Sequence, residues 1–155
     1  MDLAIAVREI EPEIHFIEDL CYVAKLTRCH VEIALREIGL CPGQDQFLDA
    51  LRIDATKRLG EVADELNIRA STASKITNRL VDRGFAKRVS MPGDLRKIGL
   101  ALTSEGSKAQ RAVRDIWQTL ETEIFSELSL AETDEIREGL CLMDRRLKER
   151  LRRLR

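Results

Sequence analysis

Proline, glycine, histidine and aromatic residues are all scarce in this sequence of 155 residues. Three prolines and eight glycines leave few places where a helix must end, so we expect a mainly helical chain. Two histidines provide little for acid–base chemistry, and the sequence has no glycine-rich phosphate loop, nucleophile elbow or HExxH pair. We therefore expect that the protein is not an enzyme and needs no cofactor.

Long apolar runs and paired cysteines are missing as well. No apolar run approaches the roughly 18 residues that a membrane-spanning helix requires, and the N-terminus lacks the pattern of a secretory signal. The four cysteines (Cys21, Cys29, Cys41 and Cys141) form no CxxC pair, and their spacing matches no zinc template. These absences predict a cytoplasmic protein with reduced thiols, without a metal site and without a membrane partner.

The charges are distributed unevenly, although the net charge is only −1. Residues 1–51 carry 4 Lys/Arg against 10 Asp/Glu, and residues 105–155 carry 11 of each. Residues 52–104 carry 11 Lys/Arg against 6 Asp/Glu, which is an excess of +5. A surface that binds phosphates needs concentrated positive charge, so this distribution favours a nucleic-acid partner for the middle third of the chain.

The spacing of apolar residues predicts a series of helices interrupted by one hairpin. Spacings of three and four indicate helices, whereas the alternation of apolar residues around Leu100 indicates a half-buried strand. Thr103 is a suitable N-cap for the helix that follows this strand. The predicted helices span about 8–38, a short segment containing Phe47, Leu48 and Leu51, and about 58–66, 70–83, 104–128 and 131–153. The predicted strands span 85–90 and 97–102, joined by a turn at 91–94.

Two short helices joined by a tight turn and followed by a two-stranded hairpin make a winged helix-turn-helix. The fold class is therefore mainly α with a small β-hairpin wing, flanked by N- and C-terminal helices. In the second short helix, Ala73, Ile76 and Leu80 form an inner stripe that we expect to pack on the first helix. The opposite side, the outer stripe, consists of Ser71, Thr72, Lys75, Asn78 and Arg79.

The outer stripe offers groups that suit the major groove of DNA. Lys75 and Arg79 can donate to guanine, Asn78 can pair with adenine, and hydroxyl groups can donate to phosphates or base edges. In the hairpin, Arg96 can enter a narrow minor groove, and Asp94 can hold it extended through an ion pair or simply support the turn. The predicted DNA-binding residues are Ser71, Thr72, Ser74, Lys75, Asn78, Arg79, Asp94, Arg96 and Lys97.

The middle of the chain resembles the MarR family of winged helix-turn-helix transcriptional regulators. The resemblance covers about residues 39–106, and its strength lies in the order and spacing of short motifs. One departure is Arg58, which stands where such a motif usually begins its first helix with Thr or Ser. The motifs are GLCPGQ (39–44), LGEVA (59–63), RASTASK (69–75), RLVDRGF (79–85), GDLR (93–96) and LALTSEG (100–106).

The resemblance implies the domain organisation and the partners. Residues 1–38 would be an N-terminal dimerisation helix, 39–104 the DNA-binding domain, and 105–155 the C-terminal dimerisation helices. The homodimer would place two recognition helices in successive major grooves of near-palindromic double-stranded DNA, about 10 base pairs apart. It would act as a repressor that a small effector releases from its operator. The last helix carries a suitable apolar seam for dimerisation, Ile136, Leu140, Met143, Leu147, Leu151 and Leu154.

Three alternatives concern the signal and the partner. Members of the resembled family bind small aromatic anions, and His15, Phe16 and Trp117 could line such a site, although Phe16 and Trp117 equally fit a core. Cys21 lies in a segment resembling the hydroperoxide-sensing branch of the family, which suggests a thiol sensor, yet its acidic neighbours do not favour a thiolate. A winged helix that binds only protein is the third alternative, and it predicts an apolar or acidic outer stripe.

Overall fold

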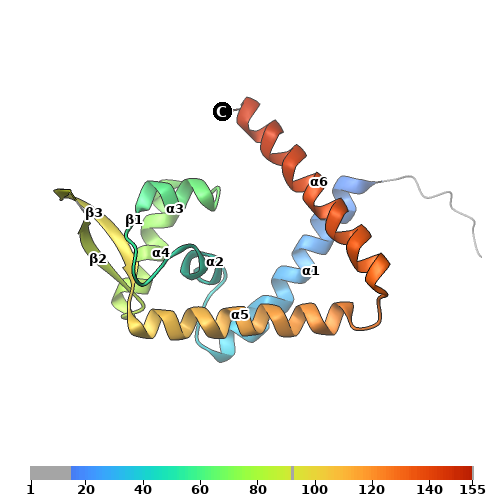
Figure 1. The fold of residues 1–155 in the computed structure, drawn as a ribbon, viewed down its shortest axis with the longest axis horizontal. Coiled ribbons are helices and arrows are strands. Elements are labelled where there is room, and N and C mark those ends of the chain that lie inside the picture. The colour runs from blue at the N-terminus through green and yellow to red at the C-terminus, as the bar shows by residue number, and fades with distance from the viewer. Residues whose placement is uncertain (1–14, 92, 155) are drawn as a thin grey trace, which may run out of the picture.

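The order of the elements follows the predicted alternation of helices and hairpin. A computed structural model describes residues 15–91 and 93–154. One long helix, α5, runs from the base of the hairpin to α6, and a lobe of α2, α3, α4 and the sheet lies at its hairpin end (Figure 1). The fold is therefore mainly α with a small β-sheet, as predicted. The elements are α1 (Phe16–Glu37), α2 (Gln44–Ala50), β1 (Lys57–Arg58), α3 (Leu59–Glu65), α4 (Ala70–Asp82), β2 (Ala86–Met91), β3 (Asp94–Leu102), α5 (Ser104–Phe125) and α6 (Leu130–Leu154).

The first predicted helix is described only in part. It was expected to run without a break from about residue 8, but His15 is not helical and α1 begins only at Phe16. Residues 1–14, including Ile10 and Ile14, lie outside the described residues. From Phe16 the helix runs unbroken to Glu37. Its only buried residues are Val31 and Leu35, in the C-terminal half. The N-terminal half of α1 is therefore not covered by the other described residues of the chain.

The core lies where α2, α4, α5 and the sheet meet. Phe47, Leu48 and Leu51 at α2 are fully buried, and Val113 of α5 is buried against the same cluster. Burial of such side chains contributes about 1.5–3 kcal/mol each, which makes this cluster the main source of stability of the lobe. Gln110 of α5 is also buried and donates to main-chain carbonyls at the end of α2. The core thus fixes α2 against α5.

The sheet has three strands in the order β1-β3-β2, and all neighbouring strands are antiparallel. The predicted hairpin is present, but the prediction of a turn at 91–94 was too long. Met91 and Asp94 are paired, so β3 begins three residues earlier than expected, after an irregularity between Ser90 and Met91. The two-residue strand β1 was not predicted, because a pair this short carries no alternating pattern.

Local hydrogen bonds explain where the helices begin. At α3, Glu61 accepts from the backbone N–H of Arg58 at 2.9 Å, so the helix starts there although residue 58 has no acceptor side chain. At α5, the Thr103 hydroxyl accepts from the N–H of Gly106 at 2.9 Å, which confirms the predicted N-cap. At α6, Ser129 and Glu132 bond to each other's backbone N–H groups.

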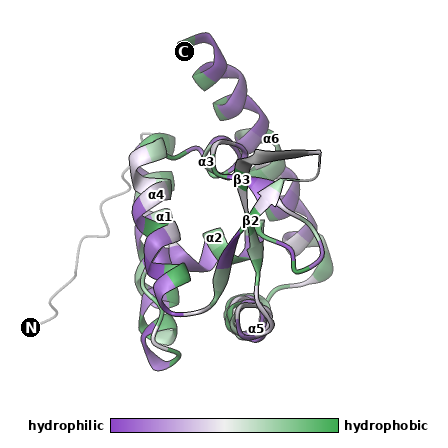
Figure 2. Cartoon of the chain, turned by 90° about the vertical axis from the view of Figure 1, so that its left-hand side faces the viewer, coloured by the Kyte–Doolittle hydropathy of each residue, from purple (hydrophilic) through white to green (hydrophobic). Residues whose placement is uncertain are grey.

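Within the part of the chain that the structure describes, no residue of α6 is buried. Its C-terminal half faces α2 and α3 of the lobe across cavities that Asp144 and Lys148 help to line, and it shows alternating apolar and polar patches along its length (Figure 2). Leu140 is 57% exposed and Leu147 is 43% exposed, although both belong to the predicted seam. Among the described helices, none combines the length and the apolar character needed to cross a bilayer.

Candidate nucleic-acid interface

The outer stripe of α4 faces solvent along its whole length. Ser71, Thr72, Lys75, Asn78 and Arg79 are all exposed, and Ser74 is half-buried. The opposite side of the helix is anchored, because Ala73 and Leu80 are fully buried and Ile76 packs on the core from its edge. The structure therefore brings together the six residues of α4 that the sequence analysis had selected, and it turns five of them outward.

The inner stripe differs from the prediction at one position. Thr77 is only 2% exposed, and its hydroxyl is buried without a hydrogen-bond partner among the described residues. The sequence pattern did not reveal this, because a threonine inside a polar stretch resembles a surface residue. Burial of a polar group without a hydrogen-bond partner costs stability. At Thr77, the packing of α4 against the core therefore outweighs the lost hydrogen bond of the hydroxyl.

The first turn of α4 is suited to an anion. It contains no acidic residue, and Arg69 precedes it as an exposed N-cap. The unpaired N–H groups at a helix N-terminus carry a partial positive charge that attracts phosphates. The only carboxylate of the helix, Asp82, lies at the opposite end. The charge of the helix is thus arranged for contact with a polyanion.

Arg83 holds the C-terminal end of α4 in place. Its guanidinium donates to the carbonyl of Gly39, in the turn after α1, and lies over the ring of Phe85 at 4.7 Å from the centroid. These contacts join α4 to a segment 44 residues earlier in the chain. Sequence analysis missed this role of Arg83, because no spacing rule relates residues so far apart.

Asn78 is not free on the outer stripe. Its Oδ1 accepts a hydrogen bond of 2.6 Å from Nη2 of Arg88, on the first strand of the hairpin. Asn78 and Arg88 are both exposed, so the pair lies on the surface where α4 meets the sheet. The sequence analysis assigned Asn78 to the site without its partner.

The hairpin β2–β3 projects from the lobe on the side opposite the start of α6 (Figure 1). The backbone of Asp94, Arg96 and Lys97 belongs to β3, but the side chains of residues 94–97 lie outside the described part. Lys87 on β2 is exposed and, as the neighbour of Arg88 on the same strand, lies on the opposite face of the hairpin. The predicted ion pair between Asp94 and Arg96 stays a prediction.

The three candidate effector residues come from two separate places. Trp117, half-buried on α5, lines a cavity of about 340 Å³ with residues of α2, α3 and α6. His15 and Phe16 precede and begin α1, and neither lines that cavity. Phe16 is 69% exposed, so it does not belong to the core of this chain. The structure does not bring these three residues together within one chain.

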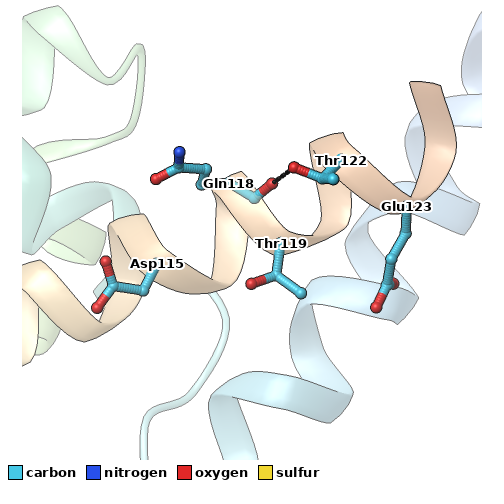
Figure 3. A pocket seen from close by; sticks show the side chains of 5 residues that line it. All are labelled: Asp115, Gln118, Thr119, Thr122 and Glu123. Atoms are coloured by element: carbon cyan, nitrogen blue, oxygen red, sulfur yellow. Dashed lines mark hydrogen bonds between the residues drawn. The ribbon is translucent and has the colours of Figure 1, made fainter. Parts of the chain in front are cut away.

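A second depression is formed by one helix alone. Its five polar residues, Asp115, Gln118, Thr119, Thr122 and Glu123, all lie on one side of α5 (Figure 3). Thr122 donates to the Gln118 carbonyl of its own helix at 2.9 Å. A single helix cannot surround a ligand, so this depression does not define an effector site.

The four cysteines, including Cys21 on α1, are exposed thiols and none is paired within the chain. Among the described residues, no group of three or more His, Cys, Asp or Glu side chains could hold a metal ion. The hypothesis that Cys21 is a thiol sensor is therefore supported only by the exposure of its thiol, and it stays a prediction.

The fold is shared with solved structures of transcriptional regulators. No protein-family model matches this sequence, and no curated protein matches it. The transcriptional regulator SlyA matches with a TM-score of 0.81 at 17% identity, over 91% of this chain and 99% of SlyA. A MarR transcriptional regulator from Methanosarcina mazei gives 0.75 at 23% identity, over 86% of this chain and 97% of that chain. A mutant of MarR from E. coli complexed with operator DNA gives 0.74 at 20% identity, over 84% of this chain and 94% of that chain.

These matches span nearly the whole length of each compared protein. The chain therefore has the MarR-type winged-helix fold, in agreement with the resemblance of its short motifs. With identities of 17% to 23%, the comparison concerns the fold.

Proposed function

We propose that this protein is a MarR-type transcription regulator that binds double-stranded DNA and is not an enzyme. The observation that carries the proposal is the outer stripe, whose hydroxyl, amide and cationic side chains face solvent beside a projecting hairpin. The stripe is neither apolar nor acidic, which is the opposite of what a purely protein-binding winged helix predicts. A mutant of E. coli MarR with the same fold is complexed with operator DNA, which supports DNA as the partner of this fold.

The roles of the site residues follow from their chemistry. Lys75 and Arg79 donate to guanine edges in the major groove, since cations with several donors pair best with its two acceptors. The hydroxyls of Ser71, Thr72 and Ser74, near the start of the helix, contact phosphates or neighbouring base edges. In the hairpin, Arg96 and Lys97 contact the minor groove, with Asp94 as the partner of Arg96.

We propose further that the protein acts as a homodimer, built from residues 1–38 and 105–155 around the DNA-binding domain 39–104. The exposed apolar seam of α6, together with exposed residues of α1 such as Ile17 and Leu26, is too apolar to remain in water. A twofold dimer presents two copies of α4, which favours a near-palindromic operator with half-sites about 10 base pairs apart.

The biological setting completes the proposal. In the cytoplasm, the dimer represses genes until a small effector, for which an aromatic anion is the first candidate, releases it from DNA. The cavity beside Trp117 is the first candidate for part of the effector site, because it lies between the DNA-binding lobe and α6. A partner chain would have to supply the rest of this site.

The test is binding of the purified chain to a duplex from the region upstream of its own coding sequence, followed by fluorescence anisotropy. Affinity should fall steeply between about 50 and 200 mM salt, because phosphate contacts release counterions. Sedimentation of the complex should give two chains per duplex.

Variants locate the interface. Arg79→Ala should weaken specific binding by about 1–3 kcal/mol and relax the sequence preference. Arg137→Ala is the matched control: it removes the same side chain from the beginning of α6, at the far end of α5 from the hairpin (Figure 1), and should leave affinity unchanged. Two outcomes would show that α4 does not recognise the bases. One is an equal loss of DNA affinity in both variants. The other is an Arg79→Ala protein that binds specific and random DNA as tightly as the original protein does.

A further inference from the structure

The pair formed by Asn78 and Arg88 bears on which bases α4 recognises, an inference that rests on the proposed DNA-binding function. The two residues lie ten positions apart, on α4 and on β2, and are joined by a hydrogen bond of 2.6 Å. Arg88 is in register with Leu100, which is buried at 3% exposure. Paired residues of neighbouring strands lie on the same face of a sheet, so Arg88 extends along the face that is packed against the core and α4.

The chemistry of the partner determines how the Asn78 amide is oriented. An arginine guanidinium has only N–H donors, so it can bond the amide oxygen but never the amide nitrogen. Oδ1 must therefore point toward Arg88 on the sheet, and Nδ2 must point away from Arg88. A hydrogen bond to a cation is stronger than a neutral one, which favours this orientation over its reverse.

The orientation matters because recognition of adenine by asparagine needs both ends of the amide. Oδ1 accepts from the adenine amino group while Nδ2 donates to N7. In this protein Oδ1 already accepts from a cation, and the adenine amino group is itself a donor with positive partial charge. Oδ1 keeps a second lone pair, but the adenine amino group would have to approach it beside the Arg88 guanidinium, and the two positively charged donors repel each other.

We propose that Arg88 is a specificity-determining positioning residue, which restricts Asn78 to donating through Nδ2 and thereby directs it away from adenine. The favoured edges at the base pair facing Asn78 are those that present acceptors without a competing donor, and guanine with its N7 and O6 is the strongest of them. Arg88 acts here through Asn78, whereas its remaining donors can still contact a phosphate.

The experiment is selection from a pool of duplexes with randomised sequence, followed by sequencing of the bound fraction. It compares the unaltered full-length protein with Asn78→Ala, Arg88→Met and Arg88→Lys. At the position that loses its preference in Asn78→Ala, the unaltered protein should favour guanine. Arg88→Met should shift that same position toward adenine by at least about five-fold, the low end of what one bidentate contact discriminates.

The controls separate orientation from charge and from folding. Arg88→Lys keeps a donor and should keep most of the original preference. Lys87→Met removes one exposed cation from the same strand and should lower affinity without changing any base preference. Circular dichroism of each variant checks the fold.

Two results overturn the inference while leaving DNA binding intact. One is an adenine requirement at the Asn78 position in the unaltered protein, and the other is an Arg88→Met preference identical to the original. A shift confined to positions that do not depend on Asn78 counts as this second result, because the preference at the Asn78 position is then unchanged. Failure of the unaltered protein to enrich any sequence refutes the proposed function, and this inference with it.

Discussion

Replacement of Gly106 by alanine tests how closely α5 approaches the DNA-binding lobe. Gly106 lies in the first turn of α5, and a Cβ placed on it would lie 1.8 Å from the carbonyl oxygen of Phe85 and 2.7 Å from its carbonyl carbon. A carbon and a carbonyl oxygen normally stay about 3.3 Å or more apart, so the two segments would have to separate by about 1.5 Å. Neither contact can be relieved by a side-chain rotation, since both atoms belong to the backbone.

The Phe85 carbonyl also has little freedom to turn away. It accepts from the backbone N–H of Thr103 at 3.1 Å, and it shares the single Thr103 hydroxyl proton, at 3.2 Å, with the carbonyl of Gly84, which is nearer at 2.6 Å. Overpacking in a well-packed region costs about 1–3 kcal/mol, and here loss of these bonds adds to it. We therefore expect Gly106→Ala to lower the free energy of unfolding by about 3 kcal/mol or more.

The matched control is Gly60→Ala in α3, away from the proposed dimer contacts, where a Cβ would meet nothing within 4 Å. This change should stabilise the protein by about 0.5–1 kcal/mol, because alanine restricts the unfolded chain and favours helix. Urea unfolding followed by circular dichroism, at equal chain concentration for all variants, measures both effects. A Gly106→Ala protein within about 0.5 kcal/mol of the original would show that the approach of α5 to Phe85 is not as close as described.

Three further predictions concern buried polar groups and a helix end. Gln110→Leu removes two hydrogen bonds, of 2.7 and 3.0 Å, that the side chain donates to carbonyls at the end of α2. Urea unfolding should show that the free energy of unfolding falls by about 1–3 kcal/mol. An unchanged free energy would mean that water replaces the amide. Thr77→Val removes the buried hydroxyl, which has no hydrogen-bond partner among the described residues, and should raise the free energy of unfolding by about 1 kcal/mol. Thr72→Val on the exposed side of α4 should not raise it. Destabilisation by Thr77→Val would indicate that the hydroxyl does have a hydrogen-bond partner. Hydrogen bonds from the Ser129 hydroxyl and backbone hold the pKa of Glu132 below its ordinary value. The ionised Glu132 therefore contributes to the stability of α6. This contribution is complete above the pKa of glutamate in the unfolded chain and is lost as the pH falls through the lowered pKa. An NMR titration should find that lowered pKa, and Ser129→Ala should return it toward the ordinary value.

The helices, the hairpin and the outer stripe could be predicted from the sequence because they follow local rules. The 3.6-residue period separates Ala73 and Leu80 from Lys75 and Arg79 on any straight helix, whatever packs against it. The N-cap at Thr103 is equally local, since a hydroxyl three residues before an N–H needs no distant partner. Such rules also explain why the bounds of the helices were correct to within a few residues, except for the start of α1, which begins at Phe16 instead of near residue 8.

The tertiary structure alone decided which side chains meet. Thr77 is buried because the helix is pressed against the core at that position, and a polar letter in the sequence does not show it. Asn78 with Arg88, and Arg83 with Gly39, join elements whose separation depends on how the helices and the sheet pack together. A periodic pattern states which face of an element is turned inward, but the partner across the contact is determined by packing, and packing is a property of the whole chain.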